Sequence, residues 1–337
     1  MSSAALAASI PRLSPDDLAR AGRILSSVSR SFEERVVGQA GLRRSLMIAL
    51  MTGGHVLLES VPGLAKTTAA ETLAHAVQAS FARIQCTPDL LPSDIIGTQI
   101  FDYARSTFET QLGPVHANFV LLDEINRSSA KTQSAMLEAM QERQTSIGGV
   151  NYPLPELFIV LATQNPIEQE GTYHLPEAQL DRFLLKEKLE YPAFAEEIEI
   201  VNRMDAGVYD HPSLAPTVTI DDVLFLQRAT KQVYLDASIV NYIVSAVYIT
   251  RHAATYIPAA LATAIDFGAS PRASIAFSRS ARALALLAGR DHVVPDDVKA
   301  MRHTVLRHRL ILGFEAIAGD VAPEAIIDAV FAAVPSP

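Results

Sequence analysis

The sequence has few of the features that mark secreted, membrane-spanning or nucleic-acid-binding proteins. It has one cysteine, Cys86, which excludes an intramolecular disulfide framework and predicts a reducing compartment. No apolar run reaches the roughly 18 residues of a membrane span, and the most apolar segment, 237–265, contains Arg251 and His252. The formal net charge is −9, which disfavours strong non-specific binding to nucleic acid. Together these absences predict a cytoplasmic protein without a membrane span.

The predicted organisation is a short leader followed by two domains. Residues 1–14 lack the basic and long apolar regions of a signal peptide, and we expect a flexible leader there. The 337 residues leave room for two domains with a core in each. A stretch at 210–217, rich in proline and polar residues, separates two different patterns. We therefore predict an α/β core at 15–210 and an all-helical domain at 211–337.

Short apolar runs alternate with helical or polar stretches in the first predicted domain. This pattern is typical of a parallel α/β sheet whose strands are buried on both faces. The predicted strands are at 55–59, 81–85, 119–122 and 157–162. Helices are predicted to begin after Ser14 and to span about 40–51, and in the second domain apolar periodicity predicts helices at 222–230, 238–251, 273–288 and 296–310.

The string ESVPGLAKTT, residues 59–68, has the spacing of a phosphate-binding loop, G-x-x-x-x-G-K-[ST], without its two glycines. Lys66 and Thr67 are in place, while Ser60 and Ala65 stand at the glycine positions. The loop lies between a predicted strand and a predicted helix, which is the context that the motif requires. Such a loop presents backbone N–H groups and a helix N-terminus to phosphate, with the lysine on the β and γ oxygens and the threonine on a metal ion.

The two replaced glycines differ in their predicted cost. Ala65 directly precedes the helix, where we expect right-handed geometry that tolerates a Cβ. Ser60 is the more awkward replacement if its position needs a positive φ or very close backbone approach. Gly63, after Pro62, still supplies a conformationally free residue at the loop tip. Ser60 is therefore the residue whose effect on nucleotide affinity the sequence leaves open.

Polar residues follow two of the predicted strands, where ligands of parallel sheets gather. Asp123 would hold Mg²⁺, largely through its waters, and Glu124 would orient and deprotonate an attacking water. Asn165 would hydrogen-bond that water or the terminal phosphate without repelling it. Each also has a simpler interpretation, a solvated acidic turn for the acids and a turn before Pro166 for Asn165.

Two arginines are candidates for contacts with the transferred phosphoryl group. Arg182 offers a fork of donors to the equatorial oxygens, although beside Asp181 its simpler interpretation is a surface ion pair. Arg272 falls in the first turn of a helix that Ser270 would cap and Pro271 would begin. A cation there is mildly unfavourable against the helix dipole, which hints at a functional role.

Taken together, these strings resemble the MoxR family of AAA+ ATPases over about residues 15–336. The resemblance rests on many matches in the same order along the chain. The matching strings are VVGQ (36–39), HVLLESVPGLAKT (55–67), LPSDIIG (91–97), GPVHANFVLLDEINR (113–127), KTQSAMLEAMQE (131–142), ATQNPIEQEGTYHLPEAQLDRF (162–183), GASPRAS (268–274) and GRDHVVPDDVK (289–299).

The resemblance implies a role for each candidate residue. Val37 and Gly38 would lie against the adenine, and Asp123 with Glu124 would form Walker B. Asn165 would be sensor one, Arg272 sensor two, and Arg182 an arginine finger that acts on the neighbouring subunit's ATP. The residues of the nucleotide-binding loop, Walker A, would be Ser60, Val61, Pro62, Gly63, Leu64, Ala65, Lys66, Thr67 and Thr68, with Lys66 also catalytic and Thr67 also a metal ligand.

The resemblance also implies the fold and the activity. The fold would be an AAA+ core of five parallel strands flanked by helices, with an insert at 98–112 and a hairpin at 145–155, followed by an all-α lid. The simpler interpretation of 145–155 is an ordinary edge hairpin. The activity would be Mg²⁺-dependent ATP hydrolysis by a ring, a homo-hexamer, that remodels a client together with a von Willebrand A-type partner.

Two other functions remain open at this point. One is a nucleotide-dependent binding scaffold with little turnover, in which Ser60 has weakened the loop. The other is a DNA-remodelling AAA+ ATPase, which the net charge of −9 disfavours. A GTPase is not expected, because the sequence has no N-K-x-D string for guanine selection.

Overall fold

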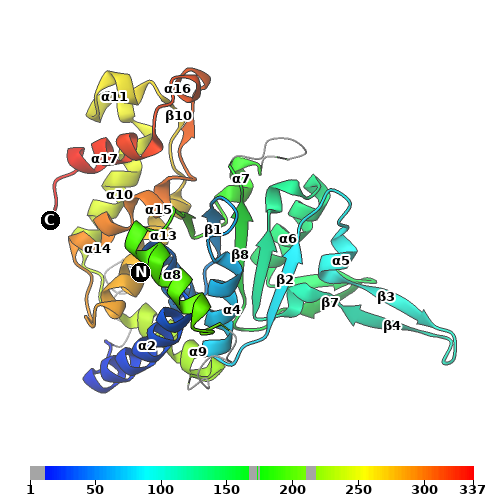
Figure 1. The fold of residues 1–337 in the computed structure, drawn as a ribbon. Helices are drawn as coiled ribbons and strands as arrows, with labels where there is room; N and C mark the ends of the chain where they lie inside the picture. The colour runs from blue at the N-terminus through cyan, green and yellow to red at the C-terminus, as the bar shows by residue number, and fades with distance from the viewer. Residues whose placement is uncertain (1–11, 167–172, 174, 210–217) are drawn as a thin grey trace, which may run out of the picture. The chain divides into compact units, whose positions relative to one another are not determined.

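The computed structural model describes residues 12–166, 173, 175–209 and 218–337 (Figure 1). The chain forms two compact units, one of residues 27–183 and 187–223, the other of residues 1–26, 184–186 and 224–337. The predicted domain boundary at 210–217 lies outside the described residues, as does the predicted leader apart from residues 12–14. Each unit is described below by itself.

A five-stranded sheet forms the centre of the first unit and confirms the predicted fold class. Its strand order is β2-β5-β8-β1-β9, and the neighbouring pairs β2–β5, β5–β8 and β1–β8 are parallel. The strands are β1 (Val56–Glu59), β2 (Phe81–Gln85), β5 (Phe119–Asp123), β8 (Ile159–Gln164) and β9 (Leu185–Lys188). Four of them lie within two residues of the predicted runs. The sequence of β9, LKEK, alternates buried and more exposed residues and contains no apolar run, so it was not predicted individually.

The helices around this sheet bury its faces. β5 is buried from Phe119 to Leu122, as expected for a parallel strand with a covered face on each side. The helices of this unit are α3 (Ala40–Thr52), α4 (Lys66–Ala76), α5 (Pro92–Ile96), η1 (Pro114–His116), η2 (Ile125–Arg127), α6 (Ala130–Glu142), α7 (Glu177–Leu180) and α8 (Phe194–Asp205), and α2 (Pro15–Arg35) has residues in both units. Ser14 accepts a hydrogen bond from Asp17 N, and α3 ends at Gly53 with φ 60°, as the sequence predicts.

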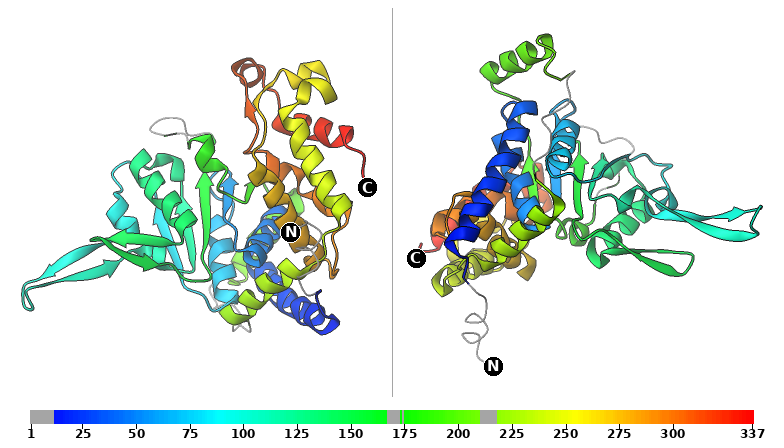
Figure 2. Two further views of the ribbon diagram at one scale, coloured as in Figure 1. Left: turned by 180° about the vertical axis from the view of Figure 1, so that it is seen from behind. Right: turned by 90° about the horizontal axis from the view of Figure 1, so that it is seen from below.

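The two predicted inserts are both antiparallel hairpins. The first consists of β3 (Gly97–Asp102) and β4 (Thr107–Leu112), and it extends well beyond the body of its unit (Figures 1 and 2). The second consists of β6 (Gln144–Ile147) and β7 (Val150–Pro153), joined by two glycines with φ of 58° and 81°. Each hairpin forms a two-stranded sheet of its own, so neither extends the edge of the central sheet.

The second unit is mainly helical. Its core includes Phe277 and Phe331, whose rings lie 5.8 Å apart, with Tyr242 edge-on to Phe331. The helices of this part are α9 (Ile220–Gln232), α10 (Ala237–Arg251), α11 (Ala253–Tyr256), α12 (Ala259–Ala262), α13 (Pro271–Leu287), α14 (Pro295–Ala300), α15 (Arg302–Leu306), α16 (Phe314–Ala318) and α17 (Pro323–Ala333).

This unit differs from the sequence prediction in several details, one of which is α17, a helix that was not predicted individually. The segment predicted as one helix at 296–310 is two short helices, because the backbone leaves helical geometry at Met301 (φ −97°, ψ 0°). The unit also contains a short antiparallel pair, β10 (Ile265–Phe267) and β11 (Ile311–Leu312), each too short to give a sequence signal. None of the described helices is long and apolar enough to cross a membrane.

The burial of the central strand β5 leads us to predict how a substitution there changes the free energy of unfolding. Leu122 on β5 is fully buried, whereas Leu112 on β4 is 48% exposed. We expect Leu122→Ala to lower the free energy of unfolding by about 2–5 kcal/mol, because it removes packed methyl groups and leaves a cavity. Urea denaturation followed by far-UV circular dichroism measures the change. The matched control Leu112→Ala should cost far less, and equal losses would contradict this account of the core.

Candidate active site

The predicted phosphate-binding loop joins the end of β1 to the start of α4. The backbone N–H of Ser60 donates to the carbonyl of Gln164 at 3.0 Å, which continues the pairing of β1 with β8. Lys66, the first residue of α4, donates its Nζ to Ser60 Oγ at 2.7 Å and to the carbonyl of Val61 at 3.2 Å. The ammonium group is therefore folded back into the loop, and the serine hydroxyl is one of the groups that holds it there.

The backbone of the loop reverses the predicted roles of its two replaced glycines. Ala65 is left-handed (φ 53°, ψ 24°), so the expectation of right-handed geometry at this position is wrong. The chain must turn there to enter α4, and a non-glycine residue in this region costs about 1–2 kcal/mol. Ser60 is not among the residues with positive φ. The first glycine position therefore requires no left-handed residue, and Ser60 carries no strain of that kind.

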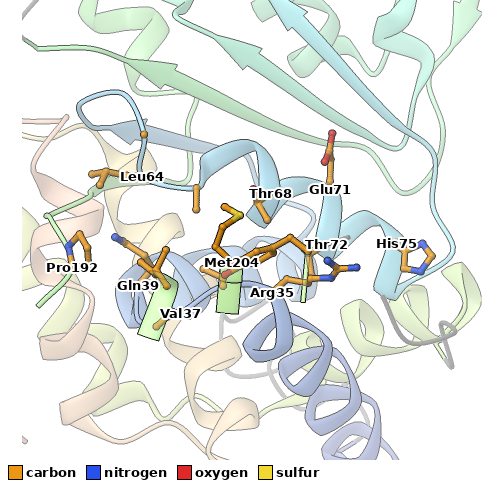
Figure 3. A pocket seen from close by; sticks show the side chains of 15 residues that line it. Arg35, Val37, Gln39, Leu64, Thr68, Glu71, Thr72, His75, Pro192 and Met204 are labelled. Carbon is orange, nitrogen blue, oxygen red and sulfur yellow. The ribbon is translucent and has the colours of Figure 1, made fainter. Parts of the chain in front are cut away.

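A cavity of 610 Å³ lies beside the loop and is lined entirely by residues of the first unit (Figure 3). Five predicted residues line it, namely Val37, Gly63, Leu64, Ala65 and Thr68. The lining residues that the sequence did not single out are Arg35, Val36, Gln39, Glu71, Thr72, His75, Pro192, Ile200, Met204 and Tyr209. Those on α4 follow Thr68 at helical spacing, so periodicity could have identified them. Those on α8 could not be found in this way, because they come from a distant part of the chain.

The wall of the cavity opposite α4 is held together by contacts between the segment 35–39 and residues 190–208. Arg35 donates to the carbonyl of Val208 at 3.1 Å, and Gln39 donates to the carbonyl of Glu190 at 3.0 Å. Gly38 has φ 65°, and a Cβ there would lie 2.5 Å from the carboxyl carbon of Glu196. A side chain at position 38 would therefore face both an unfavourable backbone conformation and the flexible end of Glu196.

The predicted acidic pair lies at the end of β5 and is hydrogen-bonded to β8. Thr163 is fully buried, and its hydroxyl donates to Asp123 Oδ1 at 2.8 Å. The hydroxyl oxygen of Thr163 accepts the backbone N–H of Glu124 at 2.8 Å, and Glu124 is left-handed with φ 57°. Strained residues of this kind cluster at functional sites. The alternative of a freely solvated acidic turn does not fit these contacts.

Cationic and amide groups surround both carboxylates. Arg83 Nη2 lies 2.6 Å from Asp123 Oδ2, and Arg127 Nη1 lies 3.2 Å from Glu124 Oε2. Gln85 Nε2 is 3.4 Å from the same oxygen of Glu124. The sequence did not single out these three residues. The alternation of Arg83 and Gln85 along β2 could have drawn attention to them only if the pairing of β2 with β5 had been known.

The sheet order brings three of the predicted groups to one edge. β8 lies between β1, which leads into the loop, and β5, which ends at the acids, and buried Asn165 directly follows β8. Burial lowers the pKa of Lys66, while the charges of Asp123 and Glu124 act in the opposite direction. The loop lysine, the acids and the amide thus form one polar cluster at the carboxyl ends of the strands.

The single cysteine lies next to this cluster without joining its chemistry. Cys86 follows β2, is 2% exposed, and its backbone N–H donates to the carbonyl of Asp123 at 2.9 Å. Burial raises the pKa of its thiol to about 12, so that the thiol is protonated near neutral pH. Cys86 is therefore a packing residue beneath the acidic pair.

The two predicted arginines are on other elements than the loop and the acidic pair. Arg182 is partly buried after α7 and lines a different cavity of 390 Å³ together with Ser134, Glu138, Gln141, Glu142 and Gln179. Arg272 is exposed in the first turn of α13, where its N–H donates to Ser270 Oγ at 3.1 Å. The predicted cap and helix start at Ser270 and Pro271 are confirmed. Arg272 belongs to the second unit, and its role is a prediction from the resemblance.

Comparisons with known proteins first identify the class. Residues 55–185 match the family model of the ATPase family associated with various cellular activities (AAA), and residues 258–330 match the AAA lid domain. Both matches agree with a parallel sheet that carries the predicted phosphate-binding loop and with a mainly helical unit that follows it. The fold is that of an AAA ATPase core with its lid.

Individual relatives narrow this class to one family. The chain is 49% identical to Chaperone MoxR1 of Mycobacterium tuberculosis over 302 residues, which cover 90% of this chain and 79% of that protein. It is 31% identical to Protein MoxR of Methylorubrum extorquens over 333 residues, covering 91% and 94%. A crystal structure of a protein from Cytophaga hutchinsonii superposes with a TM-score of 0.90 at 43% identity, covering 96% and 97% of the two chains. The chain belongs to the MoxR family of AAA+ ATPases.

The contact between Lys66 and Ser60 makes a prediction about ATP binding. Replacing Ser60 by glycine or by alanine removes the hydroxyl that accepts the ammonium group, and neither change relieves a left-handed backbone. We expect both variants to bind ATP about two- to fivefold more tightly, since a net hydrogen bond is worth about 1 kcal/mol. Titration with a fluorescent ATP analogue measures the affinity, with Ser146→Ala on exposed β6 as a control. A gain confined to the glycine variant would mean that backbone freedom, rather than the hydroxyl, limits binding.

Proposed function

We propose that this protein binds ATP at the loop cavity and hydrolyses it, and that it uses the cycle to remodel a client protein. The observation that carries the proposal is the strand order β5-β8-β1, which gathers the loop lysine, the amide of Asn165 and the two carboxylates at one edge. This is the edge at which ligands of parallel sheets bind. The combination of a positive loop with adjacent acids is the arrangement that phosphoryl transfer requires.

The loop residues fit a bound triphosphate. Gly63 has φ 85° with open space above its Cα, so phosphate oxygens can approach the backbone there. The N–H groups of residues 60–68 and the N-terminus of α4 would bind the phosphates, and Lys66 would leave Ser60 Oγ to contact the β and γ oxygens. Val37 and Gly38 would contact the adenine, in agreement with the position of Val37 in the wall of the cavity.

The acidic pair, with Thr67 and Asn165, would bind the metal ion and activate the attacking water. Thr67 and Asp123 would hold Mg²⁺, which neutralises phosphate charge when it is bound. Glu124 would accept the proton of the attacking water, and Asn165 would orient that water by hydrogen bonding. The hydroxyl of Thr163 supports this division, because it fixes Asp123 Oδ1 and the backbone of Glu124 at once.

Arg182 and Arg272 would add positively charged contacts to the phosphates of ATP. Arg182 lines a cavity separate from the loop cavity, which is compatible with a finger that acts on the ATP of a neighbouring subunit. Arg272 would contact the γ-phosphate and couple the lid to it. A ring of identical subunits, a homo-hexamer by the family resemblance, would supply Arg182 from one subunit to the next.

The client-binding part of the proposal rests on the β3–β4 hairpin and on the relatives. Phe101, Tyr103 and Phe108 form an aromatic cluster on this hairpin and are 38%, 88% and 66% exposed. Exposed apolar clusters of this kind mark sites of protein contact. The name of the mycobacterial relative describes a chaperone. A von Willebrand A-type partner, which the family resemblance implies, and a cytoplasmic location, which the sequence predicts, complete the proposal.

Replacing the predicted base tests hydrolysis against the scaffold alternative. Glu124→Gln keeps the size of the side chain but removes its ability to accept a proton. We expect the rate of ATP hydrolysis to fall by about 10²–10⁴-fold while ATP binding is retained. Glu109→Gln on the exposed hairpin is the matched control and should hydrolyse ATP as the wild type does. Equal turnover by wild type and Glu124→Gln would favour a binding scaffold, and salt-dependent DNA binding would favour a DNA-remodelling ATPase.

Replacing Arg182 tests whether it acts between subunits. We expect Arg182→Ala to reduce turnover by about 10³-fold or more, the range found for arginine fingers. A mixture of Arg182→Ala and Glu124→Gln subunits should recover activity, because an Arg182→Ala subunit retains its own Glu124 and receives an arginine from its neighbour. Recovery is measured as ATP turnover after the two proteins are mixed. The assignment would be contradicted if the mixture recovered no ATP turnover and if the turnover per subunit of the wild type did not depend on protein concentration.

A further inference from the structure

An arginine is paired with the carboxylate to which the proposed function assigns the metal. Arg83 Nη2 lies 2.6 Å from Asp123 Oδ2, and the same nitrogen donates to Gln85 Oε1 at 3.2 Å. The pair spans neighbouring parallel strands, since Gln85 on β2 is directly opposite Asp123 on β5. The other oxygen of Asp123 accepts the hydroxyl of Thr163. Both oxygens of the carboxylate therefore have donors.

The two partners of this ion pair differ in their freedom to move. The side chain of Asp123 is 13% exposed and is fixed by Thr163, whereas that of Arg83 is 48% exposed. Arg83 can therefore leave the carboxylate for solvent without disturbing the strands. A divalent cation bound at Asp123 would repel a guanidinium group at the present distance. We therefore expect the half-exposed Arg83 to move when a cation binds, while Asp123 stays in place.

We propose that Arg83 competes with Mg²⁺ for Asp123. Its guanidinium group neutralises the carboxylate while metal and nucleotide are absent, and it moves away when the metal complex of the nucleotide binds. The Mg²⁺ concentration needed for tight nucleotide binding is therefore higher than Asp123 alone would set. This inference rests on the proposed function, because it takes Asp123 as a metal ligand.

The size of the effect follows from the exposure of the pair. A partly exposed ion pair of this kind changes an equilibrium by about two- to fivefold. We expect Arg83→Gln, which keeps polar contacts but removes the charge, to lower the half-maximal Mg²⁺ concentration by that factor. Arg83→Lys retains a cation and should remain near the wild-type value. Arg105→Gln removes the same charge from an ion pair with Glu109 on the hairpin and should have no effect.

The experiment measures binding without turnover. A fluorescent, non-hydrolysable ATP analogue is titrated into each variant at a series of MgCl₂ concentrations, beginning in EDTA, and thermal unfolding confirms that each variant is folded. The proposal is supported if Arg83→Gln alone needs less Mg²⁺. It is overturned if Arg83→Gln needs the same amount or more, since more would mean that Arg83 helps Asp123 to hold the metal.

A second pair of variants locates the effect at Asp123. In an Asp123→Asn background, Arg83→Gln should no longer change the Mg²⁺ dependence, because the carboxylate for which the two cations compete is absent. An undiminished effect in that background would overturn the proposal. Binding of the analogue by the wild-type protein distinguishes failure of this inference from failure of the proposed function. If wild-type protein does not bind the analogue, or binds it independently of Mg²⁺, the proposed function fails, and if only the Arg83 variants behave otherwise than expected, this inference alone fails.

Discussion

The pairing of β8 with β1 on one side and β5 on the other is the constraint on which the site depends. It aligns Leu58 of β1 with Thr163 of β8, and Leu122 of β5 with Ala162. In this register Thr163 reaches Asp123 and the backbone of Glu124, and the loop begins one residue after β1 ends. A shift of one residue would turn Thr163 to the opposite face of the sheet and remove these contacts. The buried apolar strands therefore position the candidate site residues as well as stabilising the fold.

Several residues of the site have backbone conformations that their side chains disfavour, among them Gln39, Ala65 and Glu124. Ala65 turns the chain into α4, and Glu124 turns it out of β5, both in the left-handed region. Such conformations persist when the surrounding structure holds them in place. Here Ala69 N–H donates to the carbonyl of Ala65, and Thr163 accepts the N–H of Glu124. Secondary structure on either side thus maintains the local geometry of the loop and of the acidic pair.

The charged groups of the site are compensated within the chain. Lys66 is held by Ser60 and Val61, Asp123 by Arg83, and Glu124 by Arg127. A nucleotide that binds at this site would therefore replace hydrogen bonds and ion pairs that these charged groups already make within the protein. Each charge that a ligand engages must first leave a protein group, so the net gain is smaller than the contact itself would give. By our proposals, Ser60 and Arg83 would both lower affinity in this way, Ser60 by holding Lys66 and Arg83 by holding Asp123.

The sequence by itself determined the class of fold and the family, and it predicted the candidate residues of the loop, the acidic pair and Asn165. Apolar runs mark buried strands because both faces of a parallel sheet are covered, and the strings around 60–67 and 123–124 have fixed spacing because they follow strand ends. The sequence could not determine the conformation of Ala65, the alternating strand β9, or the wall that α8 adds to the cavity. It also could not determine that Arg83 is paired with Asp123 or that Ser60 holds Lys66. These features depend on register and on contacts between segments far apart in the chain, which local residue pattern does not encode and which only the tertiary structure decided.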